Sequence, residues 1–186
     1  MASYCGFRRA GILISVGAVV LTCGCHQAAE QQPEAGSQAL EAAPQIGEVS
    51  PINGAGRSQA FRVVASHPAG ATAINDVQVL IDEQMTATGS TACWIDVNPL
   101  KSVAARKEDG SEWLPSVPIG SSGTAASSKC SVDASGVKVE TKGNELAVTL
   151  PLTFAAKFTG AKKVWVVASG PRQHSGWQER GTWTVN

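Results

Sequence analysis

The feature of this 186-residue chain that most constrains its fold is a strict alternation of apolar with small or polar residues near the C-terminal end. The apolar positions of this run are Leu146, Val148, Leu150, Leu152 and Phe154. Successive side chains of a β-strand point to opposite faces, so the run predicts a strand with one face in a core. Pro151 interrupts it without an N–H to donate, which predicts that this strand lies at a sheet edge or carries a bulge.

Shorter runs of the same period occur throughout residues 50–186. They cover residues 61–65, 77–81, 93–97, 137–140, 164–167 and 183–185, and only Leu80 breaks the alternation in the second of them. The intervening segments contain Gly or Asn, which suit turns, and no window after residue 51 shows a helical stripe. Many short strands joined by turns predict an all-β fold, a single antiparallel β-sandwich.

The N-terminal segment has the pattern of an export signal. Arg8 and Arg9 precede an apolar run over residues 10–21, and small residues follow. These three parts in this order are typical of a secretory signal peptide. The alternative, a transmembrane anchor, requires ~20 apolar residues, and this run is shorter. We therefore expect residues 1–24 to be a cleaved signal and the protein to be exported to the cell envelope.

A cysteine directly after the apolar run adds a second prediction. With Cys25 preceded by Gly24, the leader resembles a bacterial lipoprotein signal, although Thr22 stands where that family usually has leucine. Cys23 is the second choice, because Thr22 directly before it matches less well. The resemblance implies that the cysteine carries lipid as the first residue of the mature protein. It also implies that the membrane is a partner, through an outer-membrane or surface lipid anchor.

The segment after this cysteine differs in composition from the rest of the chain. Residues 26–50 are rich in Ala, Gln, Glu and Pro and contain no Lys or Arg. The segment has too few large apolar side chains for their burial to offset the entropy cost of ordering the chain. It is therefore predicted to be a flexible tether over residues 25–49. Such a coil reaches roughly 25–30 Å. The predicted organisation is therefore a signal (1–24), a tether (25–49) and a β-sandwich domain (50–186).

Two cysteines lie outside the leader. Cys93 and Cys130 are the only cysteines of the predicted domain, and an exported protein enters an oxidising compartment. We therefore expect a disulfide between them. Its rivals are a zinc site and a reactive thiol, but neither cysteine has a nearby histidine or a second close cysteine. The alternation places the Cys93 side chain on the same face as Ile95 and Val97, which predicts a buried bridge.

Composition and motifs exclude several functions. The formal net charge is zero and the Lys and Arg residues are scattered, so we expect no nucleic-acid binding. We expect His67 and His174 to lie on exposed loops, and we predict neither a metal site nor a cofactor. Residues 120–123, Gly-Ser-Ser-Gly, do not form the nucleophile elbow of hydrolases. We predict no catalytic residues.

Several short motifs of residues 50–186 occur together in one known class of module. They are Ser50-Pro51 with Gly54-x-Gly56, Ala92-Cys93, Asn144-x-Leu146, Ser175-Gly176-Trp177-Gln178 and Gly181-Thr182-Trp183-Thr184-Val185. With them the chain resembles an uncharacterised, immunoglobulin-like β-sandwich module of exported bacterial proteins. The resemblance implies the fold and export. It implies no chemistry, because the module has no assigned activity.

Tryptophans supply the candidate binding residues. Trp94 has the opposite parity to Cys93 and should point away from the core, and Trp177 lies in a predicted loop. Exposed aromatic rings of this kind can bind a sugar or a protein partner, whereas the alternative is that each packs on the sandwich. We therefore expect a non-catalytic module for binding or adhesion, with a protein or glycan ligand. The alternatives are a hydrolase of envelope or extracellular polymer and a purely structural envelope component.

Overall fold

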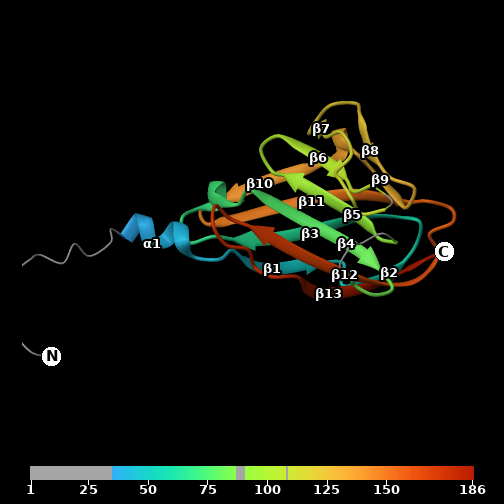
Figure 1. Ribbon diagram of the computed structural model, residues 1–186, viewed down its shortest axis with the longest axis horizontal. Coiled ribbons are helices and arrows are strands. Elements are labelled where there is room, and N and C mark those ends of the chain that lie inside the picture. Colours follow the sequence, from blue (N-terminus) through green and yellow to red (C-terminus); the bar gives the residue numbers. More distant parts are fainter. Residues whose placement is uncertain (1–34, 87–90, 108) are drawn as a thin grey trace, which may run out of the picture. The chain divides into compact units, whose positions relative to one another are not determined.

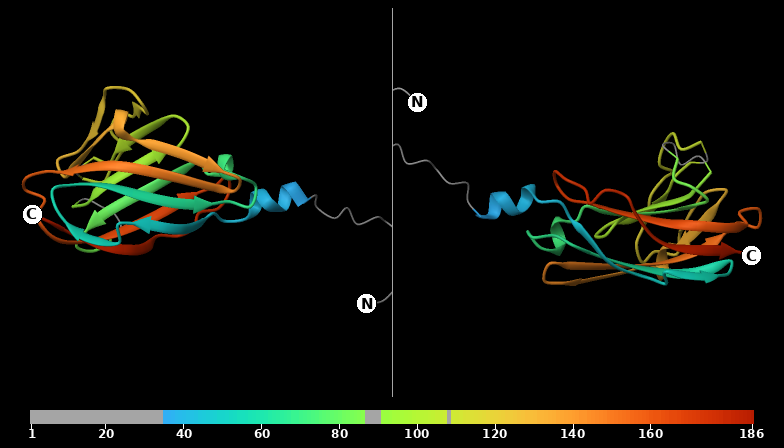
Figure 2. Two further views of the ribbon diagram at one scale, coloured as in Figure 1. Left: turned by 180° about the vertical axis from the view of Figure 1, so that it is seen from behind. Right: turned by 90° about the horizontal axis from the view of Figure 1, so that it is seen from below.

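The computed structural model describes residues 35–186 apart from 87–90 and 108. Two β-sheets stack face to face with the hydrophobic core between them (Figures 1 and 2). One short helix, α1 (Ala35–Glu41), precedes the first strand and ends before Pro44. No helix in the described ranges is long and apolar enough to cross a bilayer. The prediction of an all-β sandwich is confirmed.

The first sheet, sheet A, has the strand order β1-β3-β11-β9-β8, and β10 also pairs with β11. Its strands are β1 (Gln45–Ser50), β3 (Ser58–Ser66), β8 (Thr124–Ala126), β9 (Cys130–Asp133), β10 (Lys138–Lys142) and β11 (Glu145–Phe154). All of its pairings are antiparallel. A 3₁₀ turn, η2 (Ala134–Gly136), joins β9 to β10.

The second sheet, sheet B, has the strand order β2-β13-β12-β4-β5-β6-β7. Its strands are β2 (Asn53–Ala55), β4 (Asp76–Asp82), β5 (Cys93–Asn98), β6 (Ser102–Ala105), β7 (Val117–Pro118), β12 (Gly160–Ser169) and β13 (Gln178–Val185). Another 3₁₀ turn, η1 (Ala71–Ala73), precedes β4. The β2–β13 pair is parallel, so this sheet is mixed rather than purely antiparallel as predicted.

Strand β11 is the alternating run that the sequence predicts. All five of its apolar positions are buried, because their shared parity turns them toward the core. The prediction that Pro151 marks an edge or a bulge is wrong, since β11 lies inside sheet A and pairs with β3 in unbroken register. On its other side β10 pairs only as far as Thr149 and β9 begins at Leu152. Pro151 therefore occupies the gap between two partner strands, where no ladder bond is required.

A disulfide joins the two sheets, as the sequence predicts. Cys93 opens β5 in sheet B and Cys130 opens β9 in sheet A, with an S–S distance of 1.98 Å and a Cα–Cα distance of 5.5 Å. Both cysteines are buried in the core. The two rival roles, zinc ligand and reactive thiol, are thereby excluded for this oxidised pair.

The expected tether contains a strand. Residues 45–49 belong to β1, which pairs with β3 across a bulge between Ile46 and Val49. Both of these side chains are buried in the core, so two apolar positions suffice to order an otherwise polar segment. The prediction of a flexible tether is therefore wrong for residues 45–49, and α1 occupies residues 35–41 of the same segment. Residues 25–34 of the tether and the signal lie outside the described residues.

Candidate functional site

The outer face of sheet B, which faces away from the core, carries a second hydrophobic cluster. Leu80 of β4 stands opposite Trp94 of β5 on one side and Trp165 of β12 on the other. Leu80, Trp165 and the neighbouring Ala92 are buried, and Trp94 and Trp177 pack against them. The break in alternation at Leu80 is thus explained, because β4 needs apolar side chains on both of its faces.

Four side chains extend this cluster into solvent, and we call them the tryptophan face: Trp94, Arg106, Trp113 and Trp177. The Trp94 ring lies 5.6 Å from that of Trp113 and 5.7 Å from that of Trp177, both edge to face. The guanidinium carbon of Arg106 lies 4.9 Å from the ring centroids of both Trp94 and Trp113. Edge-to-face rings and a stacked guanidinium stabilise such a cluster beyond the area they bury.

Three members of the tryptophan face, Trp94, Arg106 and Trp177, are oriented by their local structure. Trp94 follows Cys93 in β5, so the alternation turns it outward, as predicted. The Nε and Nη2 of Arg106 donate to the Gly110 carbonyl at 3.1 and 2.7 Å, which orients the guanidinium. Trp177 follows Gly176, whose φ of 72° turns the loop between β12 and β13.

The structure brings together the two tryptophans that the sequence singles out. All three rings of the tryptophan face are half-buried, so they pack on the sandwich and still present an exposed surface. Sequence reasoning missed Trp113 and Arg106 as members. Arg106 and Trp113 form an isolated antiparallel bridge. A bridge of one residue pair leaves no alternating pattern in the sequence from which to predict it.

A row of polar side chains borders the tryptophan face on the same side of sheet B. Gln78 of β4 links its members, because its Oε1 accepts from Trp94 Nε1 at 3.0 Å and its Nε2 donates to Asp76 Oδ1 at 3.3 Å. The same Asp76 oxygen accepts from the Ser169 hydroxyl at 3.1 Å. A continuous chain of hydrogen bonds therefore crosses β5, β4 and β12.

Asp96 is the electrostatically unusual member of this row. It lies opposite Gln78 in the β4–β5 pair, and its parity is that of Trp94. Burial, and secondly the negative charge of Asp76, raise the pKa of Asp96 from its ordinary 3.8 to about 7. This side of sheet B thus combines aromatic rings with two neighbouring carboxyl groups, of which Asp96 titrates near neutral pH.

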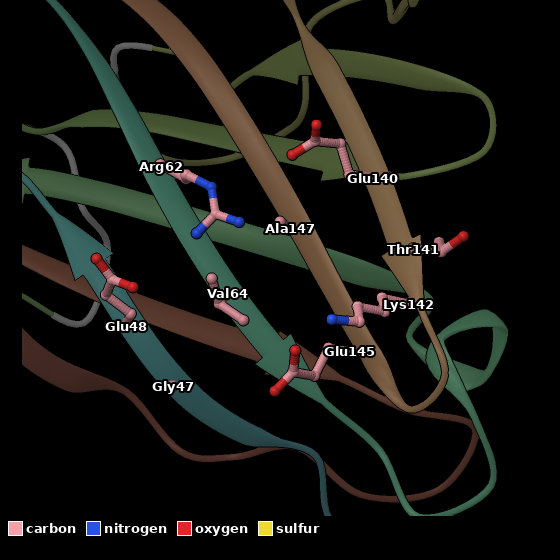
Figure 3. Close-up of a pocket in the computed structure, with 9 residues that line it drawn as sticks. All are labelled: Gly47, Glu48, Arg62, Val64, Glu140, Thr141, Lys142, Glu145 and Ala147. Carbon is pink, nitrogen blue, oxygen red and sulfur yellow. The ribbon is translucent and has the colours of Figure 1, made fainter.

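A groove on the outer face of sheet A is a second candidate site. It has a volume of about 480 Å³, and Val64 and Ala147 form its floor. Figure 3 shows charged side chains on both flanks, Glu48 from β1 on one side and Glu140 and Lys142 from β10 on the other. With Arg62 and Glu145, the lining holds cations and carboxylates intermixed. This charge pattern selects neither an anion nor a cation, so we base no function on the groove.

The remaining predicted residues fall elsewhere. Cys23 and Cys25 lie outside the described residues. The prediction that His67 lies on an exposed loop is wrong, because it continues the inward parity of Val63 and Ala65 in β3 and is buried. Its Nδ1 accepts from the Ala69 N–H at 3.1 Å, and its Nε2 has no partner among the described residues. His174 is exposed, as predicted.

Comparison with known proteins gives no family for the chain. No protein-family model matches the sequence, and no curated protein is significantly similar to it. Among solved structures, the chain has a distant match to AvmM, described as catalysing macrocyclization in alchivemycin A biosynthesis. The match covers 78% of this chain and 89% of that chain, at 9% sequence identity and a TM-score of 0.33. A likeness at this level carries no argument about function.

Proposed function

We propose that this protein is an exported, lipid-anchored module that binds glycans, without catalysis, through the tryptophan face. The observation that supports this most is the packing of Trp94 and Trp177 against each other beside the polar row of Gln78, Asp76 and Asp96. Aromatic rings offer a surface for the C–H faces of a sugar, and amides and carboxylates beside them accept hydrogen bonds from its hydroxyl groups. A protein ligand is the alternative occupant.

Replacing Trp94 or Trp177 by alanine is expected to weaken glycan binding about tenfold or more, because central aromatic side chains dominate binding energies. The measurement is a glycan array followed by titration calorimetry with the best ligand. Leu100→Ala is the control, since Leu100 is an exposed apolar residue that lies outside the tryptophan face. Folded Trp94 and Trp177 variants that bind as tightly as the parent protein would refute the assignment.

The anchor proposal is tested separately. In a bacterial host, intact-mass analysis of the full chain is expected to show a mature protein that begins at Cys25 and carries lipid. Cys25→Ser is expected to leave the protein without lipid and outside the membrane fraction, whereas Cys23→Ser is expected to leave lipidation intact. A mature terminus without lipid, or lipid on Cys23, would contradict the choice of Cys25. The sheet-linking disulfide supports export, because such bonds persist in oxidising compartments.

A polymer hydrolase is the second candidate function, and one observation favours it. The near-neutral pKa of Asp96 beside Asp76 suits a general acid, which works best when its pKa lies near the working pH. If the protein cleaves a glycan, Asp96→Asn should abolish cleavage and leave binding intact. Binding without any release of reducing ends would exclude this candidate.

A further inference from the structure

We propose a second, independent site: a cavity at the disulfide end of the sandwich that binds an anionic group, a carboxylate, sulfate or phosphate. The cavity has a volume of about 480 Å³, and its lining includes the last residue of β4 and the start of β12. These two strands are neighbours in sheet B (Figure 1). The lining of the cavity consists of Asp82, Glu83, Gln84, Thr91, Lys129, Lys157, Phe158, Thr159 and Lys162. This volume is within the range of natural small-ligand sites.

Lys162 is the structural basis of the site. Its side chain is only 6% exposed, and its Nζ lies 4.6 Å from the ring centroid of Phe158. An ammonium group withdrawn this far from water requires an anionic partner. In this structure the partner is the Glu83 carboxylate, whose Oε1 lies 3.0 Å from Nζ.

The two carboxylates of the cavity differ in how firmly they are held. Asp82 is buried, and its oxygens accept from the Glu83 N–H at 2.8 Å and from the Thr91 hydroxyl. The Glu83 side chain is 73% exposed, and within the described residues the partner of its carboxylate is Lys162. Asp82 is therefore a fixed part of the wall, whereas Glu83 can leave Lys162 by rotation of its side chain.

The two other lysines of the lining have no ion pair within the described ranges. Lys129 is half-buried directly before Cys130, and Lys157 is exposed directly before Phe158. Once Glu83 is displaced, three ammonium groups therefore face the cavity and only the already satisfied Asp82 opposes them. The Glu83 carboxylate thus occupies the position at Lys162 that a ligand anion would take. An external anion replaces it at Lys162 and gains the two further lysines as partners.

If an anion has to displace Glu83, removing the negative charge of Glu83 should increase the affinity of the cavity for anions. Glu83→Gln is expected to bind anions about tenfold more tightly than the parent protein, because the ligand no longer has to displace a carboxylate. The double substitution Lys129→Gln with Lys157→Gln is expected to weaken binding about tenfold. Lys101→Gln, at an exposed lysine outside the cavity, is the control and is expected to have no effect.

The experiment is a titration of the exported protein with sulfate, inorganic phosphate and glucuronate at constant low ionic strength, followed by NMR and calorimetry. The three probes distinguish inorganic anions from an acidic sugar as the source of the group. Unchanged or weaker binding in Glu83→Gln, equal weakening in Lys101→Gln, or no binding of any probe would overturn the proposal. Trp94→Ala is expected to retain anion binding, so this site and the tryptophan face can fail independently.

Discussion

Replacing both Cys93 and Cys130 by alanine is expected to lower the free energy of unfolding by about 4 kcal/mol. The bridge closes a loop with a sequence separation of 37, and removing it gives the unfolded chain the conformational freedom that the closed loop denies it. A domain of ordinary stability has about 5–15 kcal/mol in total, so this loss is a large fraction. The measurement is urea denaturation of the oxidised parent protein and the double variant.

Two comparisons give this test its control. The parent protein measured in reductant should lose about as much stability as the double variant, since both lack the covalent link. The double variant itself should show no further loss on adding reductant, because no bridge remains to break. A loss of less than about 1 kcal/mol would mean that the link between β5 and β9 adds little to the packing of the two sheets.

The second large effect concerns pH. Asp96→Asn is expected to raise the free energy of unfolding at about pH 8.5 by about 2–4 kcal/mol and to change it little at about pH 4. Below its ordinary pKa of 3.8, Asp96 is protonated in both the folded and the unfolded state, so its burial does not lower the free energy of unfolding. Between 3.8 and about 7 the unfolded chain releases the proton first, so the stability of the parent protein falls as pH rises. Above that range both states are ionised and the full cost of the buried charge remains, which asparagine removes.

Thermal and urea unfolding across this pH range measure the difference between the two proteins. Asp109→Asn is the matched control, because hydrogen bonds from Ser111 lower the pKa of the exposed Asp109. A lowered pKa stabilises the folded parent protein above the ordinary value, so Asp109→Asn should be less stable than the parent at high pH, where Asp96→Asn is more stable. Equal stability of Asp96→Asn and the parent protein at both pH values would show that the Asp96 carboxylate remains well solvated.

Period-two patterns predict the sandwich well because half-buried strands impose that period on the sequence. The prediction fails where a strand is apolar on both faces, as at Leu80, or where one residue beyond a strand keeps its parity, as at His67. Extending the alternation of β3 by one residue would have placed His67 correctly. Strand β1 escaped prediction because only Ile46 and Val49 are apolar and buried, and a bulge between them breaks the period.

Two members of the tryptophan face were predictable from the sequence. Strand parity predicts that Trp94 points outward, and its place in a predicted loop made Trp177 a candidate. Trp113 and Trp177 come from segments outside β5, and their contacts with Trp94 depend on how distant segments fold together. The lysine-lined cavity combines residues from the ends of four separate segments, so no spacing in the sequence reveals it.

The position of the disulfide has a consequence for resistance to proteases. Trp94, Arg106 and Trp113 all lie between Cys93 and Cys130 in the sequence, so three of the four members of the tryptophan face belong to one covalently closed ring. The side chains of Lys107 and Asp109, which follow Arg106 in this ring, are 44% and 59% exposed, so a protease can reach these two residues. A single cut there opens the ring but releases no fragment, because the bridge still holds both new ends to the same body.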